Sequence, residues 1–339
     1  MKRSSTGLII AVVAAATFGM SGAFIKPLLE AGWSPAAAVT VRALVGGTVL
    51  LPFALLGLRG RWSAVWRGRW RILLMALVGV AGTQVLYFAS LERIPVSTAV
   101  LIEYLAPLLL VGFVWARTRR MPKWAVLIGS VVAVAGLVLV VSPGGSGDLD
   151  PLGLLLAGGA AVGCAIYYVV AARPSDGLPP VAFASLGLVL GGTVLGLVGL
   201  IGVVPFAAPN VNVPFLGTLQ PWWVTLLFVG VLATGVAYAT SIAASEILGS
   251  RLASFVGLLE VVVASVYAWI LLGESLGIPQ LIGGALILAG IAFVRSDKPD
   301  ADPTAPASVL DQGELSIEPG SVAAPAGTTP SIRVSGSVV

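Results

Sequence analysis

Four ionisable side chains lie inside long apolar stretches of this sequence: Lys26, Arg42, Glu103 and Glu260. A charged group at the centre of a bilayer costs at least about 2.5 kcal/mol on insertion scales, so such groups usually face a polar cavity or one another. Two cations and two carboxylates could together hold a small molecule that carries both signs of charge. A carboxylate in such a cavity can also take up and release a proton, and Glu103 is our candidate for this role.

The same residues also have purely structural interpretations. Arg42 and Glu103 could form a fixed ion pair that only specifies how the helices pack. Lys26 could extend its ammonium group outward to the membrane surface, because its long apolar stem can lie along a helix. At helical rise, Arg42 and Glu103 each lie roughly 10 Å in from one face, whereas Glu260 lies nearest the middle of its span. Both interpretations therefore stay open at this point.

Five uncharged polar residues lie in the apolar stretches and could line the same space: Gln84, Tyr87, Tyr167, Thr234 and Tyr238. Each could equally be a bundle residue whose hydrogen bonds are satisfied by a neighbouring helix. We predict a single polar cavity whose substrate-binding residues are Arg42, Gln84, Tyr87, Glu103, Tyr238 and Glu260.

The composition identifies the class of protein that must position these residues. Of the 339 residues, 58% are hydrophobic, 10% are charged and none is histidine, whereas soluble domains are about 25% charged. The mean hydropathy of +1.02 indicates a membrane protein. With no histidine and a single cysteine, Cys164, the usual zinc ligands are missing and no disulfide can form within the chain.

Two further observations limit the function. No G-x-x-x-x-G-K-[ST] sequence is present, which excludes a P-loop ATP-driven motor on this chain. Membrane-embedded enzymes usually gather His, Asp or Ser groups near one face, and here there is no histidine and no aspartate inside an apolar run. We therefore expect no catalytic residues, no metal and no cofactor.

The apolar runs predict an all-α membrane protein. A helix needs roughly 20 mostly apolar residues to cross the bilayer, and its backbone must satisfy its own hydrogen bonds there. Ten runs meet this requirement: residues 8–29, 36–58, 72–90, 96–115, 122–142, 152–172, 180–204, 221–245, 251–272 and 278–294.

The distribution of lysine and arginine predicts the orientation of these spans. If the N-terminus is cytoplasmic, the basic residues that fall on the inner side are Lys2, Arg3, Arg59, Arg61, Arg67, Arg69, Arg71, Arg117, Arg119, Arg120, Lys123, Arg173, Arg251, Arg295 and Lys298. Only Lys26 and Arg93 then fall near the outer face. The positive-inside rule thus predicts that both termini are cytoplasmic, in the plasma (cell inner) membrane. The net charge of +4 reflects insertion and contact with anionic lipid, not nucleic-acid binding.

The sequence contains an internal repeat. The run Gly-Gly-Thr-Val-Leu at 46–50 recurs at 191–195, which is 145 residues later. Further matches join Pro35 to Pro180, Tyr87 to Tyr238, Trp115 to Trp269, Gly129 to Gly283 and Ala135-Gly136 to Ala289-Gly290. Each half then holds five spans, and an odd number forces the second half to enter the membrane from the opposite side.

An inverted repeat is typical of secondary transporters, in which two oppositely oriented halves alternate around a site near the midplane. A duplication retained only for stability is the alternative. The predicted organisation is a first five-helix repeat at 1–145, a second at 146–295 and a tail at 296–339. The tail is rich in Ala, Pro, Ser, Thr and Gly, so we expect it to be disordered and cytoplasmic.

Several motifs resemble a known family. The segment 269–290, Trp-Ile-Leu-Leu-Gly-Glu-Ser-Leu-Gly-Ile-Pro-Gln-Leu-Ile-Gly-Gly-Ala-Leu-Ile-Leu-Ala-Gly, is similar to the L-L-G-E-x-L…Q-x-x-G-x-x-L-I-x-x-G signature of the EamA-like branch of the drug/metabolite transporter superfamily. Shorter similarities are Phe18-Gly19, Arg42, Glu103-Tyr-Leu-Ala-Pro107 and Leu259-Glu260. The resemblance covers about residues 7–294. The chain differs from the family where Phe18 replaces tryptophan, Val261 replaces proline and Arg117-Thr-Arg-Arg replaces a Gly-Glu turn.

The resemblance implies ten helices in two five-helix repeats, and export or exchange of small metabolites, commonly amino acids. Combined with the buried charges, it predicts a secondary transporter of small polar metabolites that works by alternating access, with proton coupling as a hypothesis. A multidrug exporter of the same fold is the alternative, and a channel or scaffold is a further one. The expected partners are a small-molecule substrate, the lipid bilayer and protons. The oligomeric state is left open.

Overall fold

The computed structural model describes residues 2–91, 93–94, 96–141, 150–173, 177–272 and 277–296. Residues 1–297 form one unit of the chain and residues 298–339 a second one. Apart from Ser296, the predicted tail therefore lies outside the described residues, as do residues 273–276 of the family-like signature.

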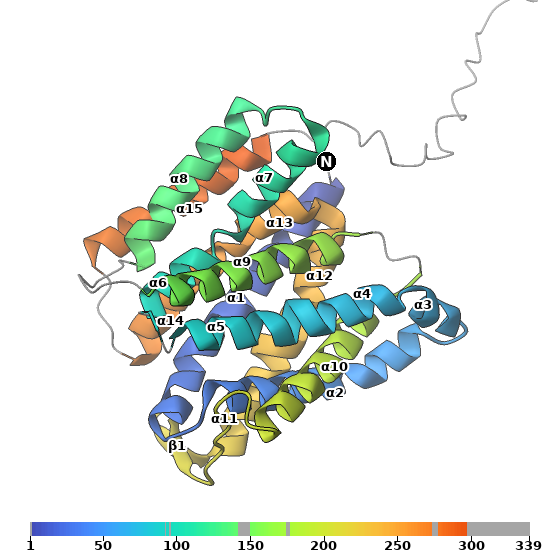
Figure 1. Cartoon of the computed structure of the whole chain (residues 1–339), viewed down its shortest axis with the longest axis vertical. Helices are drawn as coiled ribbons and strands as arrows, with labels where there is room; N and C mark the ends of the chain where they lie inside the picture. Colours follow the sequence, from blue (N-terminus) through green and yellow to red (C-terminus); the bar gives the residue numbers. More distant parts are fainter. Residues whose placement is uncertain are drawn as a thin grey trace, which may run out of the picture. The chain divides into compact units, whose positions relative to one another are not determined.

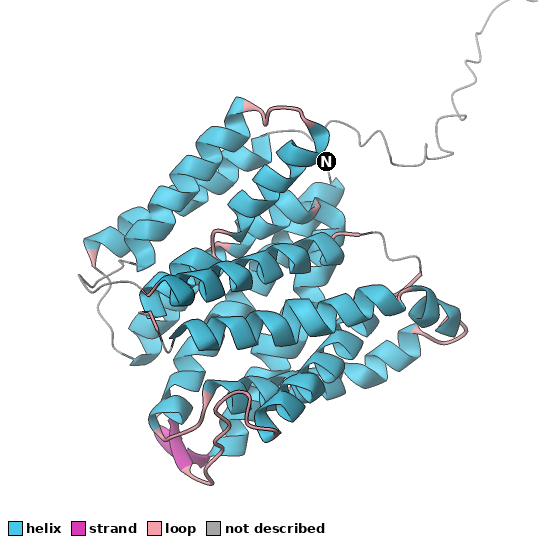
Figure 2. Ribbon diagram, viewed as in Figure 1, coloured by secondary structure: helices cyan, strands magenta, loops and turns pink. Residues whose placement is uncertain are grey.

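Helices make up nearly all of the described part of the first unit (Figure 2). The first half of the chain contains α1 (Lys2–Glu30), α2 (Pro35–Gly57), α3 (Trp62–Arg67), α4 (Arg69–Leu74), η1 (Met75–Gly82), α5 (Thr83–Leu91), α6 (Val96–Glu103), α7 (Ala106–Thr118) and α8 (Trp124–Val141). The second half contains α9 (Pro151–Ala171), α10 (Pro180–Leu200), β1 (Asn212–Phe215), β2 (Thr218–Pro221), α11 (Trp222–Phe228), η2 (Val229–Val236), α12 (Ala237–Leu248), α13 (Ser250–Gly257), α14 (Leu259–Leu272) and α15 (Ile278–Ser296).

The helices match the apolar runs of the sequence. Among the described residues, eight helical runs are long and apolar enough to cross a membrane. Two shorter apolar helices, Trp124–Val140 and Leu281–Ser296, coincide with the predicted spans 122–142 and 278–294. The structure therefore confirms a mostly helical protein with many apolar helices.

Local sequence explains where two of the long helices begin. The Ser34 hydroxyl accepts a hydrogen bond from the Ala37 amide at 3.2 Å, and Pro35 occupies the first turn of α2. A carboxylate oxygen of Asp150 caps α9 in the same way by accepting from the Leu152 amide at 3.0 Å, again just before a proline. A side-chain acceptor satisfies a free amide, and proline's fixed φ suits the first helical position.

Glycines allow four helices to cross in close pairs. The helices α8 and α15 lie side by side (Figure 1), and a Cβ added at Gly136 would lie 2.5 Å from the Gly283 carbonyl oxygen. A Cβ added at Gly283 would lie equally close to the Gly136 carbonyl oxygen, so the contact is reciprocal. The helices α2 and α10 pack through the second glycine of each repeated Gly-Gly pair, because Gly47 faces Val189 of α10 and Gly192 faces Ala43 of α2.

Two segments are wound as π-helix, a form that is rare in proteins and concentrated at functional sites. The segment η1 packs against α10, and η2 packs against α2. A Cβ added at Gly46 would lie 2.6 Å from the Gly230 carbonyl oxygen of η2, and one added at Gly191 would lie 3.0 Å from the Ala76 carbonyl oxygen of η1. The first glycine of each Gly-Gly pair therefore meets the π-helix of the other half.

One prediction needs a correction, because the protein is not entirely α-helical. The strands β1 and β2 form a two-stranded antiparallel hairpin between α10 and α11. Its turn consists of Leu216 and Gly217, with φ of 47° and 82°. Two successive residues with positive φ are typical of tight hairpins. Phe215 packs on Phe24 of α1 with a ring-centroid distance of 5.4 Å, which attaches the hairpin to the helical bundle.

Two predicted spans are interrupted. Span 96–115 is divided between α6 and α7, which are separated by Tyr104 and Leu105. Pro107 lies in the first turn of α7, where a proline cannot donate the amide hydrogen bond that would continue the preceding helix. Span 251–272 is divided at Leu258, between α13 and α14, although the chain has no proline there.

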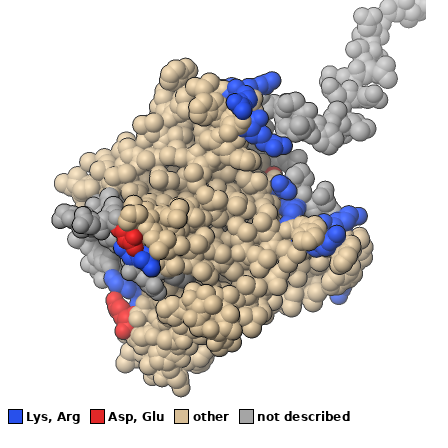
Figure 3. Space-filling view, viewed as in Figure 1, with Lys and Arg blue, Asp and Glu red and all other residues tan. Residues whose placement is uncertain are grey.

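Basic side chains gather at one end of the bundle (Figure 3). We define this basic end by the α2–α4 and α7–α8 connections, whose charged residues are Arg59, Arg61, Arg67, Arg117, Arg119, Arg120 and Lys123. The N-terminal end of α1 lies on the same side (Figure 1). The opposite end, which we call the far end, contains the α1–α2 corner and the β1–β2 hairpin.

Candidate functional site

A cavity of about 480 Å³ lies in the middle of the bundle, between helices of both halves. All six predicted site residues line it: Arg42, Gln84, Tyr87, Glu103, Tyr238 and Glu260. Lys26 and Tyr167 also line it, whereas Thr234 is buried in η2 and is not among its lining residues. The volume lies within the usual range for small-molecule sites, roughly 300–1,000 Å³.

The cavity extends from the far end to the interrupted helices. Lys26, Leu29 and Pro35 line it at the α1–α2 corner, and Gly257 and Leu258 line its deepest part. Lys26 is exposed at this corner, whereas Arg42 and the two glutamates are half-buried further in. The cavity therefore reaches exposed residues at the far end.

Arg42 is held by a neighbouring helix. Its Nη1 donates a hydrogen bond to the Ser21 hydroxyl of α1 at 2.6 Å. Arg42 and Glu103 do not form an ion pair with each other in the described part of the chain, where ion pairs such as Arg71–Glu246 and Arg93–Asp150 are present. Arg42 therefore keeps donor groups that can meet a ligand carboxylate.

Each of the two glutamates stands beside a helix interruption. Glu103 is the last residue of α6, and Glu260 lies in the first turn of α14. Free backbone groups and helix-end dipoles at such interruptions are how membrane transporters hold polar cargo. The amino end of α14 favours negative charge on Glu260, whereas the carboxyl end of α6 disfavours it on Glu103.

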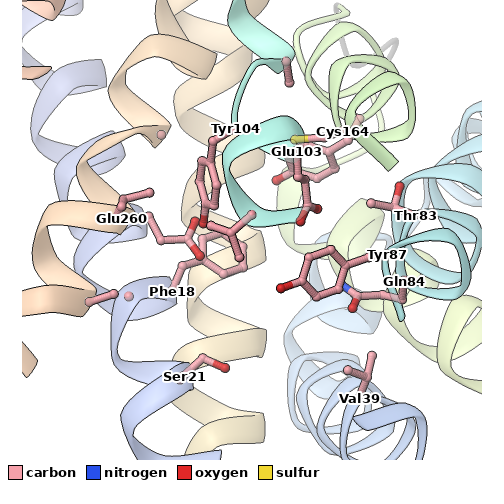
Figure 4. A pocket seen from close by; sticks show the side chains of 18 of the residues that line it. Phe18, Ser21, Val39, Thr83, Gln84, Tyr87, Glu103, Tyr104, Cys164 and Glu260 are labelled. Atoms are coloured by element: carbon pink, nitrogen blue, oxygen red, sulfur yellow. The ribbon is translucent and has the colours of Figure 1, made fainter. Parts of the chain in front are cut away.

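Tyrosines cover the carboxylates from both sides. In Figure 4 the Tyr104 hydroxyl points at the Glu260 carboxylate, to which it is hydrogen bonded, and Glu103 faces Tyr87 across the cavity. Sequence reasoning missed Tyr104, although it directly follows Glu103. It also missed Tyr168, which directly follows the predicted Tyr167. In both cases the missed tyrosine is next in sequence to a residue that was predicted to line the cavity, and this adjacency could have indicated it.

Two local features position the site residues. Gly19 lets α1 approach α14 closely, because a Cβ there would lie 2.9 Å from the Glu260 carbonyl oxygen. At the start of α5, the Thr83 hydroxyl donates to the Val78 carbonyl of η1 at 2.7 Å, which adds to the bond from the Thr83 backbone amide. Gln84 and Tyr87 then follow on α5 and line the cavity.

Among the described residues, no group of three or more His, Cys, Asp or Glu side chains could hold a metal ion. The polar groups that line the cavity include carboxylates, a guanidinium, a carboxamide, an ammonium group, and tyrosine, serine and threonine hydroxyls. Such groups can bind a charged or zwitterionic organic molecule through hydrogen bonds and opposite charges.

Comparison with known proteins assigns this architecture to a class. The model of the EamA-like transporter family matches the chain twice, over residues 5–142 and 151–296. The chain therefore belongs to the EamA-like transporter family. It is a membrane protein of a transporter family, as its apolar helices and buried charges predicted.

Its relatives have transporter names but no assigned substrate. The chain is 24% identical over 305 residues to "Uncharacterized transporter YwfM" of Bacillus subtilis, covering 85% of this chain and 93% of that protein. It is 22% identical over 306 residues to "Uncharacterized inner membrane transporter YicL" of Salmonella typhimurium, covering 88% and 97%. A solved crystal structure shares the fold, with a TM-score of 0.70 and 21% identity over 86% of this chain and 96% of that one.

Proposed function

We propose that this protein is a secondary transporter that moves small polar metabolites, such as amino acids, by alternating access. The observation that carries the proposal is the central cavity, where one guanidinium and two carboxylates contributed by both halves face the same space. A zwitterionic molecule would find a partner for each of its charges there. Export or exchange is the proposed direction.

The proposed architecture is ten spans in two inverted five-helix repeats, 1–145 and 146–295, with a cytoplasmic tail at 296–339. Three observations support it. The family model matches each half separately, equivalent glycines at 46 and 191 meet the π-helix of the opposite half, and the contact between Gly136 and Gly283 is reciprocal. The basic end would be cytoplasmic by the positive-inside rule, which places both termini inside the cell.

Each site residue has a proposed role. Arg42, already oriented by Ser21, would bind the carboxylate of the cargo. Glu260, whose charge is favoured by the amino end of α14, would bind the ammonium group. Glu103 would carry the proton, because the carboxyl end of α6 makes its charged form easier to neutralise. Gln84, Tyr87 and Tyr238 would complete the walls.

Substrate counterflow in proteoliposomes tests the proposal. Vesicles containing the protein are loaded with amino acids, nucleosides, sugars and cationic dyes, and efflux is read by mass spectrometry with and without a pH gradient. We expect selective efflux that responds to the gradient, and we expect Glu103→Gln to lose most of that response. The matched control is Glu30→Gln, because Glu30 is an exposed carboxylate at the end of α1.

The outcomes separate the parts of the proposal. Efflux without any selectivity would favour a channel, and no efflux from folded protein would contradict transport. Selective efflux that is unchanged in Glu103→Gln would retain the transporter and reject the proton role of Glu103.

One observation favours a second candidate, a multidrug exporter. Aromatic side chains cover much of the cavity: Phe18, Tyr87, Tyr104, Tyr167, Tyr168 and Tyr238. Aromatic faces attract organic cations, and carboxylates strengthen that attraction. Efflux of the dyes in preference to the amino acids would select this candidate over the metabolite transporter.

A further inference from the structure

A second, much smaller chamber of about 20 Å³ lies behind the main cavity. Small side chains of α1 line it at Ala11, Ala14 and Ala15, together with Ser241 and Ser245 of α12. It shares four lining residues with the main cavity, namely Phe18, Tyr168, Gly257 and Glu260. These four residues therefore form the boundary between the two spaces.

The chamber lies on the side of that boundary that faces the basic end. Along α1, Lys26 and Leu29 line the main cavity at the far end, and Phe18 lies at the boundary. Ala11, Ala14 and Ala15 of the chamber come before Phe18 in the sequence and therefore lie closer to the basic end. Ala11 lies roughly 10 Å from Phe18 along the helix axis at 1.5 Å per residue. The antiparallel helix α12 shows the same order, with Tyr238 on the main cavity and Ser245 on the chamber. The chamber thus continues the line of the main cavity.

The boundary is built from packed aromatic rings. Phe18 meets Tyr238 edge to face at a centroid distance of 5.1 Å, and Tyr167 meets Tyr168 in the same manner at 5.1 Å. The Tyr168 hydroxyl rests directly on Gly257, so a Cβ added there would overlap it. Only a glycine at 257 lets this ring close against α13.

The mostly apolar wall of the narrow chamber contains two serine hydroxyls. Ser245 has an exposed fraction of 0%, and its hydroxyl meets no hydrogen-bond partner among the described residues. Ser241 accepts a hydrogen bond from the Tyr167 hydroxyl at 2.8 Å. A buried hydroxyl without a partner costs about 1–3 kcal/mol, so Ser245 is unfavourable in a permanently dry core. It suits a space that a polar solute or water passes through.

We propose that Phe18 and Tyr168 form the gate that closes the transport path toward the basic end, and that the serine-lined chamber is the collapsed continuation of that path. The inference rests on the proposed transport function, because it assigns the closed side of the same pathway. Opening requires Phe18 to leave Tyr238 and Tyr168 to leave Gly257. The small residues of α1 then allow the chamber to widen without moving bulky side chains.

Thiol labelling tests the gate without any need for a substrate. The single cysteine, Cys164, lines the main cavity. In membrane vesicles of both orientations, we expect a charged methanethiosulfonate to react with Cys164 from the far-end face. In a Cys164→Ser background, Ser245→Cys should react from the basic face only, and only when the chamber opens to that face, because Ser245 is fully buried while the chamber is collapsed. Adding Phe18→Ala should raise its rate from the far-end face at least tenfold, and Gly257→Ala should do the same by displacing Tyr168.

The matched control is Phe24→Ala, which removes the same side chain from the same helix but contacts Phe215 and Phe228 instead of the boundary. It should leave the labelling pattern unchanged. Ala14→Cys reports on the same chamber from α1 and replaces Ser245→Cys if that variant does not fold.

Labelling of the chamber from the far-end face at the rate of Cys164, with Phe18 intact, would overturn the gate. The gate would also be overturned if neither Phe18→Ala nor Gly257→Ala changed the rate at which the chamber cysteine is labelled from the far-end face. Because no transport is measured, failure of the gate is distinguishable from failure of the proposed function.

Discussion

The two halves of the molecule interrupt corresponding helices in different ways. In the first half, α6 ends at Glu103 and Pro107 lies in the first turn of the next helix. In the second half, α13 ends at Gly257 and Glu260 lies in the first turn of α14. In the proposed repeat the two carboxylates lie three positions, about one helical turn, from exact equivalence. Glu103 therefore stands at a helix carboxyl end, and Glu260 stands at a helix amino end.

This difference gives two similar residues different electrostatic surroundings. A helix amino end stabilises negative charge and a helix carboxyl end opposes it. Tyr104 adds to the contrast, because its hydroxyl is hydrogen bonded to Glu260. This difference is the reason why we propose that Glu260 binds the ammonium group of the cargo and that Glu103 carries the proton.

The largest expected effect is that Glu260→Gln and Glu103→Gln change different properties of transport, the KM in the first variant and the response to a pH gradient in the second. Loss of a charge-assisted contact to the cargo, about 1.5–3 kcal/mol, should raise the KM of Glu260→Gln by roughly 10- to 150-fold while the response to a pH gradient remains. Glu103→Gln should instead lose the response to the gradient, with a smaller change in KM. Initial rates of transport against substrate concentration, measured at two gradients, separate these outcomes. Identical behaviour of the two variants would show that the helix ends do not distinguish the carboxylates.

A smaller effect should come from the reciprocal contact between α8 and α15. Gly136→Ala and Gly283→Ala would each place a methyl group about 2.5 Å from a backbone carbonyl oxygen. Overpacking of this kind costs about 1–3 kcal/mol, and we expect the two variants to lose similar amounts of stability. Thermal unfolding of the purified protein in detergent measures both.

Gly112→Ala is the control for this pair, because a Cβ at Gly112 meets nothing within 4 Å. It should unfold at or slightly above the temperature of the wild type, because alanine favours a helix where its methyl group meets no obstacle. If only one of Gly136 and Gly283 is sensitive, the two halves are not equivalent at this crossing.

Sequence patterns predicted much of this arrangement, for identifiable reasons. Buried charges are costly in lipid, so Arg42, Glu103 and Glu260 had to share a polar space, and the structure places them around one cavity. The interruption at Leu258 was not predicted, since no proline marks it and neither Gly257 nor Glu260 beside it requires a helix to break. Thr234 was assigned to the possible lining but faces the packed interior, because helices that are apolar on all sides carry no pattern that reveals their rotation. The hairpin turn at Leu216 was missed because leucine rarely adopts a positive φ.

The smallest expected effect concerns the contact between the halves at the far end. Arg93 of the first half donates a hydrogen bond to Asp150 of the second at 3.0 Å, and this contact together with the Leu152 amide lowers the pKa of Asp150. A depressed pKa in the folded state means that the contact contributes stability above the ordinary aspartate pKa, and that this contribution is lost as the pH falls through the folded-state value. Arg93→Gln should therefore reduce the unfolding temperature slightly at neutral pH and make no difference in strong acid. Because both side chains are partly exposed, added salt should also reduce the difference in unfolding temperature between the wild type and Arg93→Gln at neutral pH. A difference that persists in acid would mean that Arg93 stabilises the fold by packing and not through the Asp150 carboxylate.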